Sequence, residues 1–214
     1  MQLIKYAHAC VRVESDAAVL VIDPGMFTER VALDGADAVL ITHEHADHLD
    51  LGALTDALGT RPAVRIFTNA AVVGQLGDLA DIATTVEPGD QFEAAGLPIR
   101  AFGGLHADIH PDIPRVPNLG FLVAGSLYHP GDSFDVPAGI DVDTLFVPIS
   151  APWLKASESI DFVRAVAPRR AFALHDHLLS PPGLGLVDGL LSRLSGTAYQ
   201  RLASGESVPF RSPD

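Results

Sequence analysis

Residues 43–48 read His43-Glu44-His45-Ala46-Asp47-His48, and they follow directly on residues 38–42, the apolar run Ala-Val-Leu-Ile-Thr. An apolar run without alternation predicts a strand that is covered on both faces. Imidazole and carboxylate are ligands that Zn, Mn and Fe(II) accept, and a loop at a strand end can bring alternate side chains into one pocket. The alternative is an acidic, histidine-rich helix N-terminus in solvent. Because a buried strand leads into the motif, we expect a metal site here.

Three further segments place a histidine or an aspartate at the end of a predicted strand. They are residues 102–106 with His106, residues 128–133 with Asp132, and residues 172–177 with His175 and His177. A single histidine after an apolar strand is more often a structural residue that forms hydrogen bonds than a metal ligand. Together with residues 43–48, however, these segments offer a full set of ligand types at strand ends, which favours a shared site.

The rest of the chain predicts many short strands with helices between them. Expected strands cover residues 3–6, 10–14, 18–23, 64–68, 84–86, 99–102, 119–124, 126–129, 144–148 and 170–174, and expected helices cover residues 50–59, 69–79, 157–167 and 186–194. This pattern favours two packed sheets flanked by helices. Residues 105–118 form one long irregular stretch, and a loop of that length in a compact domain is usually functional.

In their order along the chain, these motifs resemble those of the metallo-β-lactamase fold superfamily of metallohydrolases. The resemblance rests on residues 43–48, His106, Gly131-Asp132 and His175, and it extends through residues 20–25 and 168–175 to nearly the whole chain. It implies an α+β class, a four-layer αββα sandwich of two mixed β-sheets flanked by helices, formed as a single domain over residues 1–214.

Within that superfamily, the sequence looks like the small UlaG-like branch, which includes ascorbate-6-phosphate lactonase. The similar segments are residues 6–10, 119–121 and 147–149. Ala7 stands where a glycine is common in that branch, and Ala151-Pro152-Trp153 replaces its usual glycine-rich turn. For this reason no substrate is carried over from a named member.

The resemblance also implies a set of metal ligands. His43, His45 and His106 would hold one ion, Asp47, His48 and His175 would hold a second, and Asp132 would bridge the two. We expect two divalent ions, zinc in the first place, with manganese or iron as alternatives because these ligand types do not separate them. Two such ions lower the pKa of a shared water and stabilise the oxyanion that forms after attack.

Catalytic roles in moving protons are expected for Asp47 and His177. His177 lies two residues after His175, so on an extended segment both side chains would point toward the site, although a surface position is an equal alternative. Asp23 resembles the carboxylate that orients a ligand histidine, although a turn-forming aspartate before Pro24 is an equal alternative.

Three histidines have no assigned role. His8 resembles a position near the pocket in the UlaG-like branch, and His110 lies in the loop after His106, where a lid would be. For both, an exposed loop position is favoured, and His129 is expected to pack. In the irregular stretch, Arg115 offers a single cation for a phosphate or carboxylate. Trp153 and Phe134 are candidates for the pocket wall.

Composition excludes several classes of protein. The 214 residues are 48% hydrophobic and carry 27 acidic against 14 basic side chains, a formal net charge of −13. This acidity argues against broad contact with nucleic acid or with an anionic membrane, since both require clustered Lys and Arg. The single cysteine, Cys10, is expected in the core, and residues 1–6 lack the pattern of a secretory leader. We expect a cytoplasmic protein that acts on a small molecule, and the apolar fraction is compatible with a homo-oligomer.

The leading hypothesis is a metal-dependent hydrolase whose dinuclear site activates water to attack an ester, lactone, amide or phosphodiester bond of a small cytoplasmic substrate. The first alternative is an iron-dependent oxidoreductase on the same fold, because ligand identity does not choose between Zn, Mn and Fe. The second is a metal-binding protein without catalytic activity.

Overall fold

The computed structural model describes residues 1–15, 18–59, 61 and 63–210, and its strands form two seven-stranded sheets. In spatial order, the first sheet contains β14 (Glu206–Pro209), β1 (Gln2–Lys5), β2 (Val11–Glu14), β3 (Val19–Ile22), β4 (Ala38–Ile41), β5 (Arg65–Thr68) and β6 (Ala83–Thr85). The second contains β13 (Ala198–Gln200), β12 (Arg170–Leu174), β11 (Thr144–Pro148), β10 (Leu127–His129), β9 (Pro117–Val123), β8 (Leu97–Leu105) and β7 (Gln91–Ala94).

Both sheets are mixed. In the first, the pairs from β3 to β6 are parallel and the pairs from β14 to β3 are antiparallel. In the second, the pairs from β10 to β13 are parallel and those from β7 to β10 are antiparallel. The prediction of two mixed sheets is therefore confirmed.

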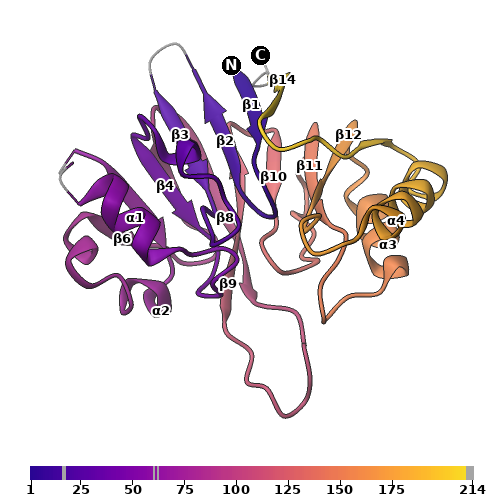
Figure 1. Cartoon of the computed structure of the whole chain (residues 1–214), viewed down its shortest axis with the longest axis horizontal. Helices are drawn as coiled ribbons and strands as arrows, with labels where there is room; N and C mark the ends of the chain where they lie inside the picture. Colours follow the sequence, from indigo (N-terminus) through magenta and orange to yellow (C-terminus); the bar gives the residue numbers. More distant parts are fainter. Residues whose placement is uncertain (16–17, 60, 62, 211–214) are drawn as a thin grey trace.

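Helices cover the outer face of each sheet (Figure 1). The first sheet is covered by α1 (Leu51–Leu58), α2 (Ala70–Val73) and the 3-10 helices η1 (Arg30–Leu33) and η2 (Gly77–Ile82), and the second by α3 (Ala156–Val166) and α4 (Pro181–Leu194). The arrangement is the four-layer αββα sandwich that was predicted. No helix among the described residues is long and apolar enough to cross a membrane.

Three apolar clusters fill the spaces between the layers. The central cluster takes side chains from both sheets, such as Leu40 and Phe121. Strand β4 shows how the sequence sorts its side chains, since Ala38 and Leu40 enter the central cluster while Val39 and Ile41 pack toward α1. An unbroken apolar strand thus has both faces covered, as its composition predicts.

The predicted helix over residues 69–79 is wrong in extent. Helix α2 ends at Val73, and η2 begins at Gly77, which has a φ of 56°. That left-handed conformation suits glycine and interrupts a regular helix. In contrast, α4 begins earlier than the predicted residue 186, because Ser180 caps it through Gly183 N and Pro181 needs no amide donor in the first turn.

Three strands escape the sequence pattern altogether. β7, β13 and β14 have three or four residues each, and most of their side chains are exposed or half-buried. β14 pairs with β1 from the other end of the chain. Short, mostly exposed strands carry little apolar signal, so their pairing is decided by the sheets that they join.

The predicted ligands follow the ends of strands in both sheets. The motif at residues 43–48 follows β4, His106 follows β8, Asp132 follows β10 and His175 follows β12. The long loop between β8 and β9 projects beyond the sheets (Figure 1). The site therefore lies at one edge of the sandwich, with this loop beside it.

Candidate metal centre

Two neighbouring clusters of metal-binding side chains lie at this edge. One comprises His43, His45, His106 and Asp132, and the other comprises His8, Asp47, His48 and His175. Within each cluster, one donor atom per residue lies within 4.8 Å of the others. The structure thus brings together all seven residues that the resemblance implies as ligands, and it adds His8.

Hydrogen bonds behind the site orient two of the imidazoles. Asp23 accepts from Thr42 N and from the Thr42 hydroxyl, each at 2.7 Å, and its Oδ2 lies 2.7 Å from His48 Nδ1. Because a carboxylate only accepts, His48 Nδ1 donates, which leaves Nε2 directed at the site. Thr42 Oγ1 lies 3.0 Å from His43 Nδ1 and fixes that ring in the same sense. Asp23 is therefore the orienting carboxylate and not only a turn residue.

His106 is held in the same way by the backbone. Its Nδ1 lies 2.6 Å from the Ala107 carbonyl oxygen, which can only accept a hydrogen bond. Its Nε2 consequently faces Asp132, at 3.2 Å from Oδ2. Three of the predicted ligand histidines therefore present Nε2 to the site.

Asp132 lies between the two clusters. Its Oδ1 is 2.9 Å from Nε2 of His48 and 2.9 Å from Nε2 of His175, while its Oδ2 faces His106. The indole Nε1 of Trp153 donates to the same Oδ2 at 2.9 Å. One carboxylate therefore reaches side chains of both clusters, and an indole fixes its orientation.

Burial and charge shape the protonation of the site in opposite directions. Burial lowers the pKa of His43 well below its usual value, which keeps that imidazole neutral. Burial also disfavours the His48 cation, but the Asp132 and Asp23 carboxylates outweigh it and raise the pKa of His48 well above its usual value. For Asp132 burial works toward a higher pKa, yet His175 and His48 hold its pKa well below the usual range. Ionised carboxylates therefore face imidazoles across the site.

The donor set suits divalent cations. Nε2 of His48 lies 3.0 Å from Nε2 of His175, and Nε2 of His43 lies 3.1 Å from Nδ1 of His45. Asp132 Oδ1 is buried and has no hydrogen-bond partner of sound geometry. Converging nitrogen and carboxylate lone pairs are what Zn, Mn and Fe bind, and neutral histidine is the form that coordinates them.

His8 is the site residue that sequence reasoning missed. It is 1% exposed, and not in an exposed loop as expected. Its Nε2 lies 2.9 Å from Asp47 Oδ2, and its ring stacks on that of His175 with centroids 4.5 Å apart and planes at 4°. Its likeness to a position near the pocket in the UlaG-like branch pointed to the site, but its place in a turn between two apolar strands did not show what the turn packs against.

The remaining histidines lie outside the two clusters. His177 is exposed, and the centroid of its ring lies 4.7 Å from that of Phe27. Strand β12 ends at Leu174, and His175 takes a φ of 62°. The extended segment that would direct His177 at the site therefore does not form. His110 is exposed in its loop, as expected.

His129 packs, as expected, and also ties two loops together. It is fully buried, its Nε2 donates to the Ala9 carbonyl oxygen at 3.0 Å, and its Nδ1 accepts from Gly131 N. It therefore connects the turn that carries His8 to the turn that carries Asp132.

A cavity of about 130 Å³ opens above the clusters. Its lining includes the site residues His8, His45, Asp47, His106, Asp132 and His175, together with Ile109, Ser150, Ala151, Pro152, Trp153 and Leu178. His177 and Phe134 are not among these residues; Phe134 instead supports Trp153, with ring centroids 5.1 Å apart. Trp153 is thus a wall of the cavity, as suggested by the sequence.

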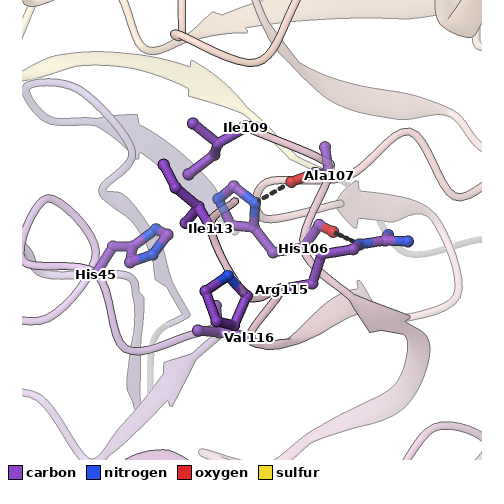
Figure 2. Close-up of a pocket in the computed structure, with 8 residues that line it drawn as sticks. His45, His106, Ala107, Ile109, Ile113, Arg115 and Val116 are labelled. Carbon is purple, nitrogen blue, oxygen red and sulfur yellow. Dashed lines mark hydrogen bonds between the residues drawn. The ribbon is translucent and has the colours of Figure 1, made fainter. Parts of the chain in front are cut away.

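Arg115 does not meet the expectation of a free cation over the site. Its Nε donates to the His106 carbonyl oxygen at 2.6 Å and lies 3.2 Å from Asp108 Oδ1. Figure 2 shows its guanidinium on the side of His106 away from His45. Arg115 therefore holds the backbone of a predicted ligand.

The two mixed sheets, their outer helices and the His/Asp clusters define a metal-dependent hydrolase of the metallo-β-lactamase superfamily. Comparison with known proteins agrees. The profile of the family described as "Beta-lactamase superfamily domain" matches residues 2–175. The chain belongs to this family.

Individual relatives extend the likeness over the whole chain. Protein Rv0786c of Mycobacterium tuberculosis is 39% identical over 216 residues, covering 98% of this chain and 100% of that protein. A UPF0173 metal-dependent hydrolase of Pyrobaculum arsenaticum is 26% identical over 201 residues, covering 82% of this chain and 84% of the other. Igni18, a metallo hydrolase from Ignicoccus hospitalis, shares the fold, with a TM-score of 0.73, 18% identity and 98% of each chain covered. Membership of the UlaG-like branch stays a prediction.

Proposed function

We propose that this protein is a dinuclear metallohydrolase that cleaves an ester, lactone, amide or phosphodiester bond of a small cytoplasmic molecule. The observation that carries the proposal is Asp132, whose two oxygens face His48 and His175 on one side and His106 on the other. Zinc is the first choice for both ions, with manganese or iron as alternatives. The acidic composition supports a substrate other than nucleic acid.

In this proposal His43, His45 and His106 would hold one ion, Asp47, His48 and His175 would hold the other, and Asp132 would be shared between the two sites. When bound, the ions lower the pKa of a water and offset the negative charge that develops on the attacked group.

The surrounding residues orient the ligands and carry the proton. Asp23, through Thr42 and His48, keeps the Nε2 atoms aimed at the site. Asp47 lines the cavity and His177 does not, so of the two expected proton carriers Asp47 has the position to accept the proton that the attacking water gives up.

The test combines metal analysis with a substrate panel. We expect the purified protein to bind two equivalents of zinc per chain and to hydrolyse members of a panel of lactones, thioesters and phosphodiesters. Asp132→Ala should bind fewer ions and lower kcat by about 100-fold or more, because both clusters lose a shared ligand. Asp135→Ala is the matched control, since the Asp135 side chain lies outside both clusters.

Two results would contradict the proposal. A protein that holds one ion per chain at saturating metal is not dinuclear. A protein purified anaerobically with iron, with optical bands and no hydrolytic activity, would favour the oxidoreductase alternative instead.

A further inference from the structure

The part of the cavity wall that is not made of predicted ligands or His8 is largely apolar. It consists of Ile109 from the β8–β9 loop, residues 151–153 before α3, and Leu178 before α4, with Ser150 as a neutral polar member. Leu178 is 58% exposed, a large apolar side chain at the rim. Since an exposed leucine beside a polar site loses contact with water when a ligand covers it, this wall favours an apolar ligand group.

Trp153 makes the wall rigid. Its Nε1 is bound to Asp132 Oδ2 at 2.9 Å, and its ring contacts the rings of Phe134 and His106, with centroids 5.1 and 5.9 Å away. The indole is therefore held in place before any substrate arrives, so ordering it on binding costs little.

No lysine or arginine is present among the described residues that line the cavity. Three cations close to the lining residues along the chain are engaged elsewhere. Lys5 is buried, with its Nζ 3.3 Å from Asp176 Oδ1. Arg115 binds the His106 carbonyl oxygen, on the side away from His45 (Figure 2), and Lys155 lies 3.6 Å from Glu158. A phosphate or carboxylate on the substrate, remote from the metals, would find no cationic partner here.

The loop that borders the cavity adds one net negative charge, because Arg115 pairs with one of its two carboxylates, Asp108. Its carboxylates Asp108 and Asp112 are 76% and 91% exposed, and the chain as a whole carries a formal net charge of −13. Two divalent ions would offset only part of that charge. The field outside the metal site therefore disfavours an anionic group on the substrate.

The volume of the cavity limits the size of the group. A dry cavity of about 150 Å³ lined by aliphatic side chains admits benzene. The volume of about 130 Å³ here is of the same order and also includes the space beside the predicted ligands, so one ring or a short alkyl chain is the upper limit.

We propose that the substrate carries a compact, uncharged apolar group beside the bond that is cleaved, and that this group packs against Ile109, Trp153 and Leu178. The proposal rests on the proposed metallohydrolase function and narrows its substrates to those without a phosphate or carboxylate on that group.

Hydroxamates of matched shape test this, because they bind zinc whatever bond the enzyme cleaves. The zinc-loaded protein is titrated with acetohydroxamate, benzohydroxamate, 4-carboxybenzohydroxamate and 4-phosphonobenzohydroxamate by calorimetry. We expect benzohydroxamate to bind about tenfold more tightly than either charged analogue.

Substitutions then locate the wall. Leu178→Ala and Ile109→Ala should each weaken benzohydroxamate by about threefold to tenfold, the scale of a few methylenes in an apolar pocket. Leu178→Lys should reverse the preference in favour of the carboxylated analogue. Leu186→Ala removes an exposed leucine of α4 outside the cavity. It should change neither the affinity for benzohydroxamate nor that for its carboxylated analogue.

Acetohydroxamate carries only a methyl group, so it tests metal binding without the apolar wall. It therefore separates a failure of the dinuclear function from a failure of the proposed apolar group. If the protein fails to hold two ions, the dinuclear function fails before the wall is tested. If two ions are present and acetohydroxamate binds, but the charged analogues bind as well as benzohydroxamate or better, the proposal of an apolar group is overturned. It is equally overturned if two ions are present and no aryl hydroxamate binds.

Discussion

His8 lies in the turn between β1 and β2, yet its side chain reaches a predicted metal ligand 39 residues away. Its φ of 63° and its stacking on His175 hold the imidazole in one orientation, with Nε2 at Asp47 Oδ2. Burial lowers the pKa of His8 despite the opposing effect of Asp47. A neutral imidazole that donates to Asp47 would leave the other carboxylate oxygen for an ion.

We predict that His8→Ala weakens metal binding at one of the two sites only, by about 10- to 100-fold, the usual effect of losing a residue that orients a ligand. The measurement is a zinc titration against a chromogenic chelator, in which the wild type should show two tight equivalents and the variant one tight and one weak. His110→Ala, which removes an exposed histidine, should behave as the wild type. Two unchanged equivalents in His8→Ala would show that Asp47 needs no support from His8.

Cys10 is buried, and the ionisation of its thiol affects the free energy of unfolding at alkaline pH. Burial raises the pKa of its thiol from 9.0 to about 12. Between these values the unfolded chain loses the proton and the folded chain keeps it, so the free energy of unfolding falls as pH rises.

We expect this thiol to contribute a total loss of about 1.4 kcal/mol between pH 8 and pH 10, most of it above pH 9. Urea unfolding at pH 8, 9 and 10 measures the loss, and Cys10→Ala should reduce it by that amount while other groups titrate as before. The same loss in both proteins would mean that the thiol ionises equally in the folded and unfolded chains.

At the scale of elements, the turn after β3 supports the ligand loop after β4. Met26 N donates to the Ala46 carbonyl oxygen at 2.8 Å, and Asp50 N donates to that of Pro24 at 3.1 Å. A Cβ on Gly25 would overlap the Asp47 carbonyl group and the His48 nitrogen. The absence of a side chain at residue 25 therefore sets how closely the two segments approach.

Gly25→Ala should lower the free energy of unfolding by about 1–3 kcal/mol, since backbone atoms cannot rotate out of the way as a side chain can. It should also weaken zinc binding, because the displaced segment carries Asp47 and His48. Thermal unfolding with and without zinc measures both effects. Gly185 lies in α4, where an added Cβ would have no neighbour within 4 Å. Gly185→Ala should therefore stabilise the protein by about 0.5–1 kcal/mol. If Gly25→Ala stabilised the protein as much as Gly185→Ala does, the close approach of the two segments would have no effect on stability.

At the scale of the whole molecule, the sandwich collects buried histidines and carboxylates at one edge and carries a formal net charge of −13. Buried imidazoles and carboxylates lose hydration when the chain folds, and an ion that binds the folded chain alone stabilises it. Metal and fold are therefore expected to be coupled.

Removing metal should lower Tm. An ion present at about 100 times its Kd adds roughly 2.7 kcal/mol, which in a chain of this size corresponds to about 5–10 °C. Differential scanning calorimetry of zinc-loaded protein with and without EDTA measures the shift, and excess zinc should restore the original value. A Tm that does not respond to chelator would contradict the coupling.

The sequence by itself predicted packed sheets with flanking helices and metal-binding residue types at strand ends. These predictions rest on local information, since the apolar run of β4 indicates burial on two faces and residues 43–48 indicate a loop that can gather ligands. The four-layer sandwich and the set of seven ligands were implied by the family resemblance. The family resemblance then supplied the division of these ligands into two clusters, and the geometry shows the same division.

Only the tertiary structure decided what lies against these ligands. The contacts of His8 with Asp47 and of Trp153 with Asp132 join residues 39 and 21 positions apart, and no periodicity predicts such a pair. The same holds for Arg115, whose charge is taken up by the His106 carbonyl oxygen. Residue types and spacing fix what a side chain is able to bind, but the packing of two sheets fixes which partner is close enough to bind it.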